Sequence, residues 1–178
     1  MKRILWNITL ASVITLVAYI ALYTIWGALL SGLENQTLRL FLIALMTTVA
    51  FGFFLLYTSK IRKSVGEDEV VADYKDKNYT SFVDDFKSVI DREGKMLICI
   101  AAIVLICFAL NTFDSLVFGE KTISFPTFFF APMCLFDTMI NMPFVGYLLS
   151  AVFDCIAYMI FLLLYRKRTY NYWMKNKV

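Results

Sequence analysis

Two long stretches of this sequence contain no charged residue. Residues 4–33 and 40–59 have no Lys, Arg, Asp or Glu. A soluble chain of 178 residues has too little interior to bury both stretches, and its surface would have to be polar. The stretches therefore indicate that much of the chain lies in lipid. The hydrophobic content of 60% agrees with this, because soluble domains have roughly 45–50%.

The apolar pattern predicts one membrane domain with four spanning helices. A spanning helix needs about 17–25 apolar residues, and four segments supply them. In chain order we expect a helix at 4–30, a connector at 31–39, a helix at 41–57, a polar segment at 58–95, a helix at 96–113, a stretch at 114–143, a helix at 144–165 and a tail at 166–178. The first segment is longer than the ~7–15 apolar residues of a signal peptide, so we interpret it as an uncleaved spanning helix.

The distribution of Lys and Arg predicts the orientation of these helices. Cytoplasmic loops of membrane proteins carry an excess of basic residues. If both termini are cytoplasmic, 15 of the 17 Lys and Arg lie inside, and only Arg39 and Lys121 lie outside. We therefore expect a multi-pass protein of the plasma (cytoplasmic) membrane with cytoplasmic N- and C-termini.

The stretch 114–143 is the ambiguous part of this topology, because residues 122–136 are apolar enough to be considered a fifth crossing. The apolar run is short, and all three prolines of the chain lie within the stretch. A fifth crossing would also place the basic cluster 166–168 outside. We therefore predict an outer hairpin, re-entrant or interfacial, that packs on the spanning helices, since irregular backbone at membrane depth must be covered by protein.

The polar segment 58–95 ends in a pattern typical of an amphipathic helix. Apolar residues recur at helical spacing over 82–93, with acidic residues on the other side, and Gly94 is a typical helix stop. We expect this helix along the inner membrane surface. The alternatives are packing on the cytoplasmic ends of the spanning helices or docking to a separate partner. The predicted fold class is thus an all-α integral membrane protein: a four-transmembrane-helix bundle with a cytoplasmic amphipathic helix and an outer re-entrant or interfacial hairpin.

Asp154 is the acid that lies deep inside an apolar segment. An ionised carboxylate at the centre of a bilayer costs roughly 2.5–3.5 kcal/mol, so we expect Asp154 to face the protein. Gly146, Ser150 and Asp154 recur every four residues, a spacing of small residues that lets helices approach closely. The hydroxyl groups at matching depth in other segments belong to Thr47, Thr48, Thr15 and Tyr19. Three interpretations stay open: a hydrogen bond that locks the fourth helix to its neighbours, a proton or cation site in a transport path, and a contact to another subunit.

A second polar group is predicted on the outer side. Asn111 and Asp114 end the third spanning segment, and Asp137 and Asn141 precede the fourth. Oxygen ligands of this kind could bind a cation, and two carboxylates could act as an acid/base pair. Solvated loop ends are the simpler interpretation.

Other reactive chemistry is sparse in this sequence. The chain has no histidine and no known catalytic or nucleotide-binding motif. Its four cysteines form no CxxC pair, and we interpret them as small buried side chains. We therefore expect no catalytic residue, no metal and no cofactor. The net charge of +3 is too small to indicate nucleic acid as a partner.

Three functions are compatible with these features. The first is a structural or accessory subunit of a membrane assembly, not an enzyme, that acts by helix packing in the lipid bilayer as a homo-oligomer or with other membrane subunits. The second is a small oligomeric transporter or channel that uses Asp154. The third is a lipid-modifying enzyme at the outer face, with Asp114 and Asp137 as its acids.

Overall fold

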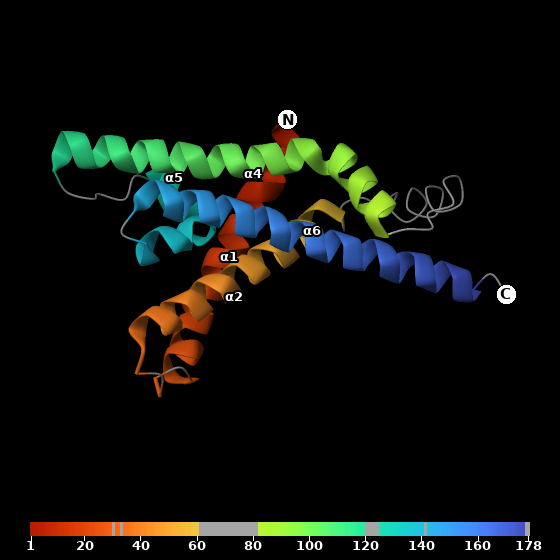
Figure 1. Ribbon diagram of the computed structural model, residues 1–178, viewed down its shortest axis with the longest axis horizontal. Coiled ribbons are helices and arrows are strands. Elements are labelled where there is room, and N and C mark those ends of the chain that lie inside the picture. Colours follow the sequence, from red (N-terminus) through yellow and green to blue (C-terminus); the bar gives the residue numbers. More distant parts are fainter. Residues whose placement is uncertain (30, 33, 61–81, 120–124, 141, 177–178) are drawn as a thin grey trace.

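The structure is a computed structural model that describes residues 1–29, 31–32, 34–60, 82–119, 125–140 and 142–176 (Figure 1). Every regular element within these residues is a helix. With the labels of Figure 1, they are α1 (Lys2–Leu29), α2 (Gln36–Lys60), α4 (Phe82–Phe118), α5 (Phe125–Phe130), the 3-10 helix η1 (Ala131–Met139) and α6 (Pro143–Asn176).

Four of the helices are long and apolar enough to cross a membrane. The segments that qualify are Lys2–Ile25, Gln36–Ser59, Glu93–Phe118 and Pro143–Thr169. This confirms the predicted all-α class and the four candidate spans. Large apolar side chains such as Val17, Ile98 and Leu116 are exposed on these helices, as expected of surfaces that face lipid. The kind of membrane and the orientation of the termini stay predictions from the charge distribution.

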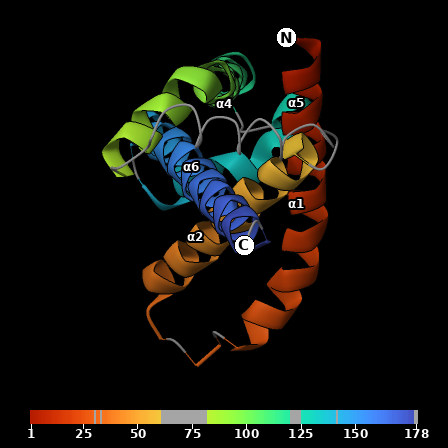
Figure 2. The same ribbon diagram turned by 90° about the vertical axis from the view of Figure 1, so that its right-hand side faces the viewer.

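The four long helices form two pairs that cross each other (Figures 1 and 2). The helix α1 packs along α2, α4 packs along α6, and α2 crosses α6, whereas α1 and α4 have little contact. The predicted bundle is therefore two crossed pairs, not four helices side by side along their whole length. The crossing is close because Gly52 of α2 has no side chain: a Cβ there would lie 2.8 Å from the backbone carbon of Ala157 in α6.

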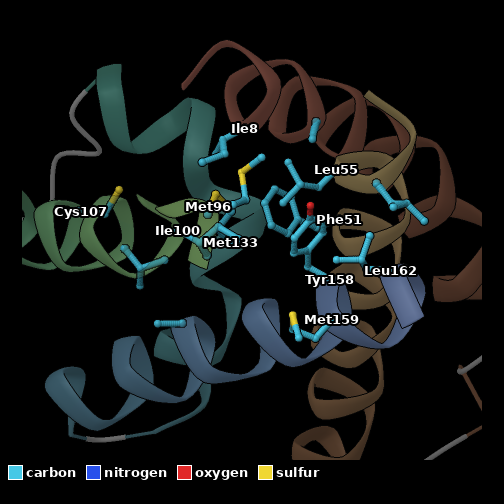
Figure 3. Close-up of a cluster of buried hydrophobic side chains, with 14 of the residues drawn as sticks. Ile8, Phe51, Leu55, Met96, Ile100, Cys107, Met133, Tyr158, Met159 and Leu162 are labelled. Atoms are coloured by element: carbon cyan, nitrogen blue, oxygen red, sulfur yellow. The ribbon is translucent and has the colours of Figure 1, made fainter. Parts of the chain in front are cut away.

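The core lies where the two pairs cross (Figure 3). It contains side chains from all four long helices and from η1. The most deeply buried of them include Ile8, Phe51, Leu55, Ile100, Met133, Tyr158 and Leu162. Lipid tails are as apolar as these side chains, so close packing, rather than removal of apolar surface from water, holds such helices together in a membrane.

The helix α4 is longer than the predicted third span, and Gly94 does not end it. The helix continues without a break from Phe82 to Phe118. A glycine inside a helix costs only about 1 kcal/mol relative to alanine, which is less than the cost of leaving backbone groups unbonded at the edge of a membrane. The predicted amphipathic segment 82–93 is therefore the first part of α4. Its placement on the membrane surface stays a prediction, and residues 61–81 of the polar segment lie outside the described residues.

The last helix is also longer than expected. The predicted tail 166–178 continues α6 as far as Asn176. No Gly or Pro interrupts residues 147–176, so nothing in the backbone ends the helix earlier. Arg166 and Thr169 are buried against the rest of the protein, which gives the first turn of this extension a packing partner.

The predicted outer hairpin contains two short helical elements, α5 and η1. Pro132 lies in the first turn of η1, where a missing backbone N–H costs nothing. At Cys134 the backbone leaves helical geometry, with φ −117° and ψ 16°. The element packs against α6, α2 and α1, and its Pro132, Met133 and Phe136 are buried. Whether it enters the membrane stays a prediction.

A hydrogen bond ties the membrane part of α4 to α6 at the core. The hydroxyl of Tyr158, which is fully buried, donates to Glu93 Oε2 at 3.0 Å. We expect Tyr158→Phe to lower the free energy of unfolding by about 1–2 kcal/mol, because the carboxylate loses a buried donor. Loss of the helical circular dichroism signal during titration with sodium dodecyl sulfate measures this. Tyr57→Phe, at an exposed position of α2, is the control, and an equal effect of both substitutions would contradict the prediction.

Candidate functional site

A cavity of about 490 Å³ lies between α4, α5, η1 and α6. Pockets for small ligands span roughly 300–1,000 Å³, so this cavity is of that class. Most of its wall surface is apolar, and the lining also carries hydroxyls, two thiols, one amide and one carboxylate. We name it the η1 pocket and define it by Phe108, Asn111, Ser115, Cys134, Asp137 and Tyr147.

The η1 pocket is closed on one side and open on the other. Cys107 and Thr127 line its inner wall and are buried. Thr112, Ser115 and Thr138 line it as well, but their side chains are exposed. These three residues therefore mark the rim through which a ligand would enter. The charge distribution predicts that this end of the molecule faces outside.

Contacts between α4 and α6 fix the polar wall of the pocket. Asn111 of α4 donates a hydrogen bond from its side-chain amide to the hydroxyl of Tyr147 in α6. The ring of Phe108 packs against the rings of Tyr147 and Phe144, with centroid distances of 5.5 and 5.6 Å. The amide and the phenol are thus held in place before any ligand arrives.

Two backbone contacts seat η1 directly on α6. The backbone N–H of Phe136 donates to the Ser150 hydroxyl oxygen at 3.3 Å. One turn away, a Cβ on Gly146 would lie 2.6 Å from the Cα of Asp137, so only glycine allows this approach. The ring of Phe136 also stacks on Phe153 of α6, with centroids 4.8 Å apart. These contacts of η1 with α6 place Cys134 and Asp137 in the pocket wall.

The predicted outer polar cluster is brought together only in part. Asn111 and Asp137 both line the η1 pocket, although they lie on different elements. Asp114 is one turn beyond Asn111 on α4 but does not line the pocket. Asn141 lies outside the described residues. The pair of carboxylates proposed for acid/base chemistry is therefore not assembled around this cavity.

Two cysteines in the pocket wall were not predicted as site residues. The thiols of Cys107 of α4 and Cys134 of η1 lie close enough to interact, and all four cysteines of the chain are free thiols. The Cys107 thiol, burial and the nearby acids Asp154 and Asp137 raise the pKa of the Cys134 thiol. A thiol must ionise to act as a nucleophile, so Cys134 is poorly suited to covalent catalysis. No spacing in the sequence pairs these cysteines.

Asp154 is completely buried, as its position in the sequence indicates. Its exposed fraction is 0%, and neither carboxylate oxygen has a hydrogen-bond partner in the described part of the chain. Ser150, Thr47, Thr48 and Thr15 are buried as well. Among the described residues, no hydrogen bond joins a neighbouring hydroxyl to Asp154, so the structure gives the locking interpretation no support.

Two of the candidate hydroxyls bond to carbonyls of their own helices and not to Asp154. Thr15 donates to the carbonyl of Ala11 at 2.7 Å, and Thr47 donates to the carbonyl of Ile43 at 2.9 Å. Ser and Thr side chains in helices commonly make this bond to the residue four positions earlier. Tyr19 is only partly buried and packs against Tyr23, with ring centroids 5.7 Å apart. Depth along the membrane therefore identified buried polar residues but not their partners.

Among the pocket residues that the sequence analysis did not name, Tyr147 has the clearest signal in the sequence. It lies three residues before Ser150 and seven before Asp154, hence on the same face of the helix.

Among the described residues, no three His, Cys, Asp or Glu side chains are grouped closely enough to hold a metal ion. No family model matches this chain, and no curated protein or solved structure is significantly similar to it.

Proposed function

We propose that this protein binds the polar end of an amphiphilic molecule in the η1 pocket. The single observation that carries the proposal is the cavity of about 490 Å³ with an apolar and aromatic wall and a few fixed polar groups. Pockets of this composition are the usual binding sites of small ligands. A ligand that enters from a membrane has an apolar chain, which lipid solvates, and a polar end, which needs the hydrogen bonds that Asn111, Tyr147 and Asp137 offer.

The volume limits the size of the ligand. Pockets for single small ligands span roughly 300–1,000 Å³, and this one has about 490 Å³. A polar headgroup with the first part of one chain is a ligand of that class. A single-chain amphiphile, or one headgroup of a larger lipid, is therefore the class of ligand that we propose.

We propose binding rather than catalysis at this site. The raised pKa of Cys134 makes its thiolate scarce at neutral pH, and Asp114 lies outside the lining of the pocket. This weighs against the lipid-modifying enzyme considered above. An accessory subunit that acts through helix packing is compatible with ligand binding, and co-purification of a partner would test that role.

Filling the η1 pocket should remove binding. The probe is a lysophosphatidylcholine with a photoactivatable diazirine on its chain, added to the full-length protein in lipid nanodiscs. We expect saturable labelling of residues in the pocket wall, competed by the unlabelled lipid and mapped by mass spectrometry. Ser115→Trp places an indole at the rim and should reduce this labelling several-fold, because it occupies the space that the ligand needs.

Val117→Trp is the matched control for this substitution. Val117 is exposed on the opposite face of α4, so its indole faces lipid and leaves the pocket unchanged. Labelling that is not saturable, that is spread over all lipid-facing helices and that is equal in the two variants would reject the proposed function.

A further inference from the structure

We propose that Asp154 is a proton-binding site that exchanges its proton with the η1 pocket. The proposal goes beyond the binding of an amphiphile, since it uses the pocket only as the entrance for the proton. It is carried by the complete burial of a carboxyl group without a partner and by the arrangement of polar and sulfur-containing side chains between that group and the pocket.

The burial of Asp154 requires that something neutralise its charge. Its exposed fraction is 0%, and both of its carboxylate oxygens lack a hydrogen-bond partner among the described residues. A buried ion without a partner costs several kcal/mol, and a carboxylate in such a place takes up a cation instead. Arg166, the next basic residue along α6, is about three turns away and is too distant to pair with it.

The surroundings of Asp154 suit a proton better than a metal ion. A hard metal cation needs several oxygen ligands, often six or so. The hydroxyls of Thr15 and Thr47 donate to carbonyls of their own helices, and the Ser150 oxygen accepts the backbone N–H of Phe136. The side chains around Asp154 belong to a closely packed core. A proton needs neither a cavity nor a set of ligands.

The η1 pocket reaches the face of α6 that carries Asp154. Tyr147, Ser150 and Asp154 share one face of the helix, and Tyr147, in the pocket wall, is about 10 Å from Asp154 along the helix axis. Cys134 also lines the pocket and is close enough to Asp154 for an ionised Asp154 to raise the pKa of its thiol. A thin layer of side chains that can donate or accept a hydrogen bond therefore lies between the pocket and the carboxyl group.

The opposite side of Asp154 is closed by large side chains. Phe51, Leu55 and Tyr158 have exposed fractions of 0%, and Leu162 has 2%. Figure 3 shows these four side chains together where α2 crosses α6. They offer no chain of polar groups to the other end of the molecule except the Tyr158 hydroxyl, which is bonded to Glu93. The proton should therefore enter from the pocket end.

The ionisable groups near Asp154 are mostly thiols and phenols. On the packed elements, the described ones are Tyr19 of α1, Glu93 and Cys107 of α4, Cys134 and Asp137 of η1, and Tyr147, Cys155 and Tyr158 of α6. The helix α2 has no ionisable side chain between Arg39 and Tyr57. A protonated carboxyl group at neutral pH would therefore be assigned to Asp154 or to one of the two other acids in this group, Asp137 and Glu93.

Infrared spectroscopy of the full-length protein in a lipid film tests the proposal. Exposed carboxyl groups are ionised at about pH 7, so a C=O band of a protonated acid at that pH comes from a buried one. We expect this band in the wild type, its loss in Asp154→Asn and its retention in Glu93→Gln and in Asp137→Asn. The band should shift after exchange into D₂O and should disappear reversibly as the pH is raised. Ser115→Trp should slow the shift several-fold, and Val117→Trp should not.

Several results would overturn the proposal. A wild type without the band has no protonated acid, and a band that neither shifts in D₂O nor responds to pH reports a proton that never exchanges. Equal exchange rates in Ser115→Trp and Val117→Trp would reject the route through the pocket. Loss of the band when NaCl replaces choline chloride at constant pH would assign the site to Na⁺ instead. The D₂O and pH measurements on the wild type test the proposal even if Asp154→Asn does not fold. Photolabelling of the pocket tests the binding of an amphiphile separately.

Discussion

Gly146→Ala should displace η1 from α6 and abolish ligand binding in the η1 pocket. The added Cβ would lie 2.6 Å from the Cα of Asp137 and 3.1 Å from the backbone oxygen of Phe136. These are backbone atoms, so no side-chain rotation relieves the overlap. Either η1 moves away or the protein loses about 1–3 kcal/mol to overpacking. Because η1 is a short element of 9 residues and α6 is a helix of 34 residues, we expect η1 to move, although Phe136 bonds to Ser150 and stacks on Phe153.

Movement of η1 would change the pocket more than the stability of the protein. The hydrogen bond from Phe136 to Ser150 would be lost, and Cys134 and Asp137 would leave the pocket wall. We therefore expect photolabelling by the diazirine lipid to fall to the background level, while helical content is retained. Gly94→Ala is the control, because a Cβ at that position meets nothing within 4 Å. Normal labelling of Gly146→Ala would contradict the proposed close packing of η1 on α6.

Gly52→Ala should have the largest effect on stability. Its Cβ would lie 2.8 Å from both the carbonyl carbon and the Cβ of Ala157, and 2.9 Å from the backbone nitrogen of Tyr158. Here two long helices cross, and neither can move without disturbing the core around Phe51 and Leu55. We expect the free energy of unfolding to fall by about 2–3 kcal/mol, near the upper end of measured overpacking costs. Titration with sodium dodecyl sulfate, followed by circular dichroism, measures the change.

The comparison with Gly94→Ala separates packing from helix propensity. Alanine is preferred over glycine inside a helix by about 1 kcal/mol, so Gly94→Ala should stabilise α4 slightly. A gain in stability from Gly52→Ala as well would mean that α2 and α6 do not cross closely at this point. Fully folded Gly52→Ala should still bind the diazirine lipid, because its overlap lies away from η1. Gly146→Ala and Gly52→Ala therefore report on different contacts of α6.

The proposed pocket and the proposed proton site share one face of α6. Tyr147 faces the pocket, Ser150 holds η1, and Asp154 lies in the core. Displacement of η1 in Gly146→Ala would remove the cover over Ser150. The exchange of the Asp154 proton with D₂O should then become faster, whereas Ser115→Trp makes it slower.

The sequence by itself determined the helical class and the number of candidate spans. In lipid the backbone has no water to bond with, so an uncharged stretch of sufficient length has to form a helix. The same reasoning placed Asp154 inside the protein, because a carboxyl group facing lipid is costly. It did not determine where α2, α4 and α6 end, since the ends of helices in water depend on local packing and capping.

Only the tertiary structure decided which side chains meet. Cys107, Asn111, Cys134 and Tyr147 line one pocket because two helix pairs cross and η1 rests on α6. That arrangement depends on close packing at Gly52 and Gly146, where an added Cβ would lie within about 3 Å of a neighbouring backbone. The sequence shows these positions only as glycines. The hydroxyls of Thr15 and Thr47 share the depth of Asp154 but bond to their own helices. The depth of a side chain in the membrane follows from its position along a spanning segment. Its contacts depend on how the helices rotate and cross, and the residues next to it in the sequence do not determine that.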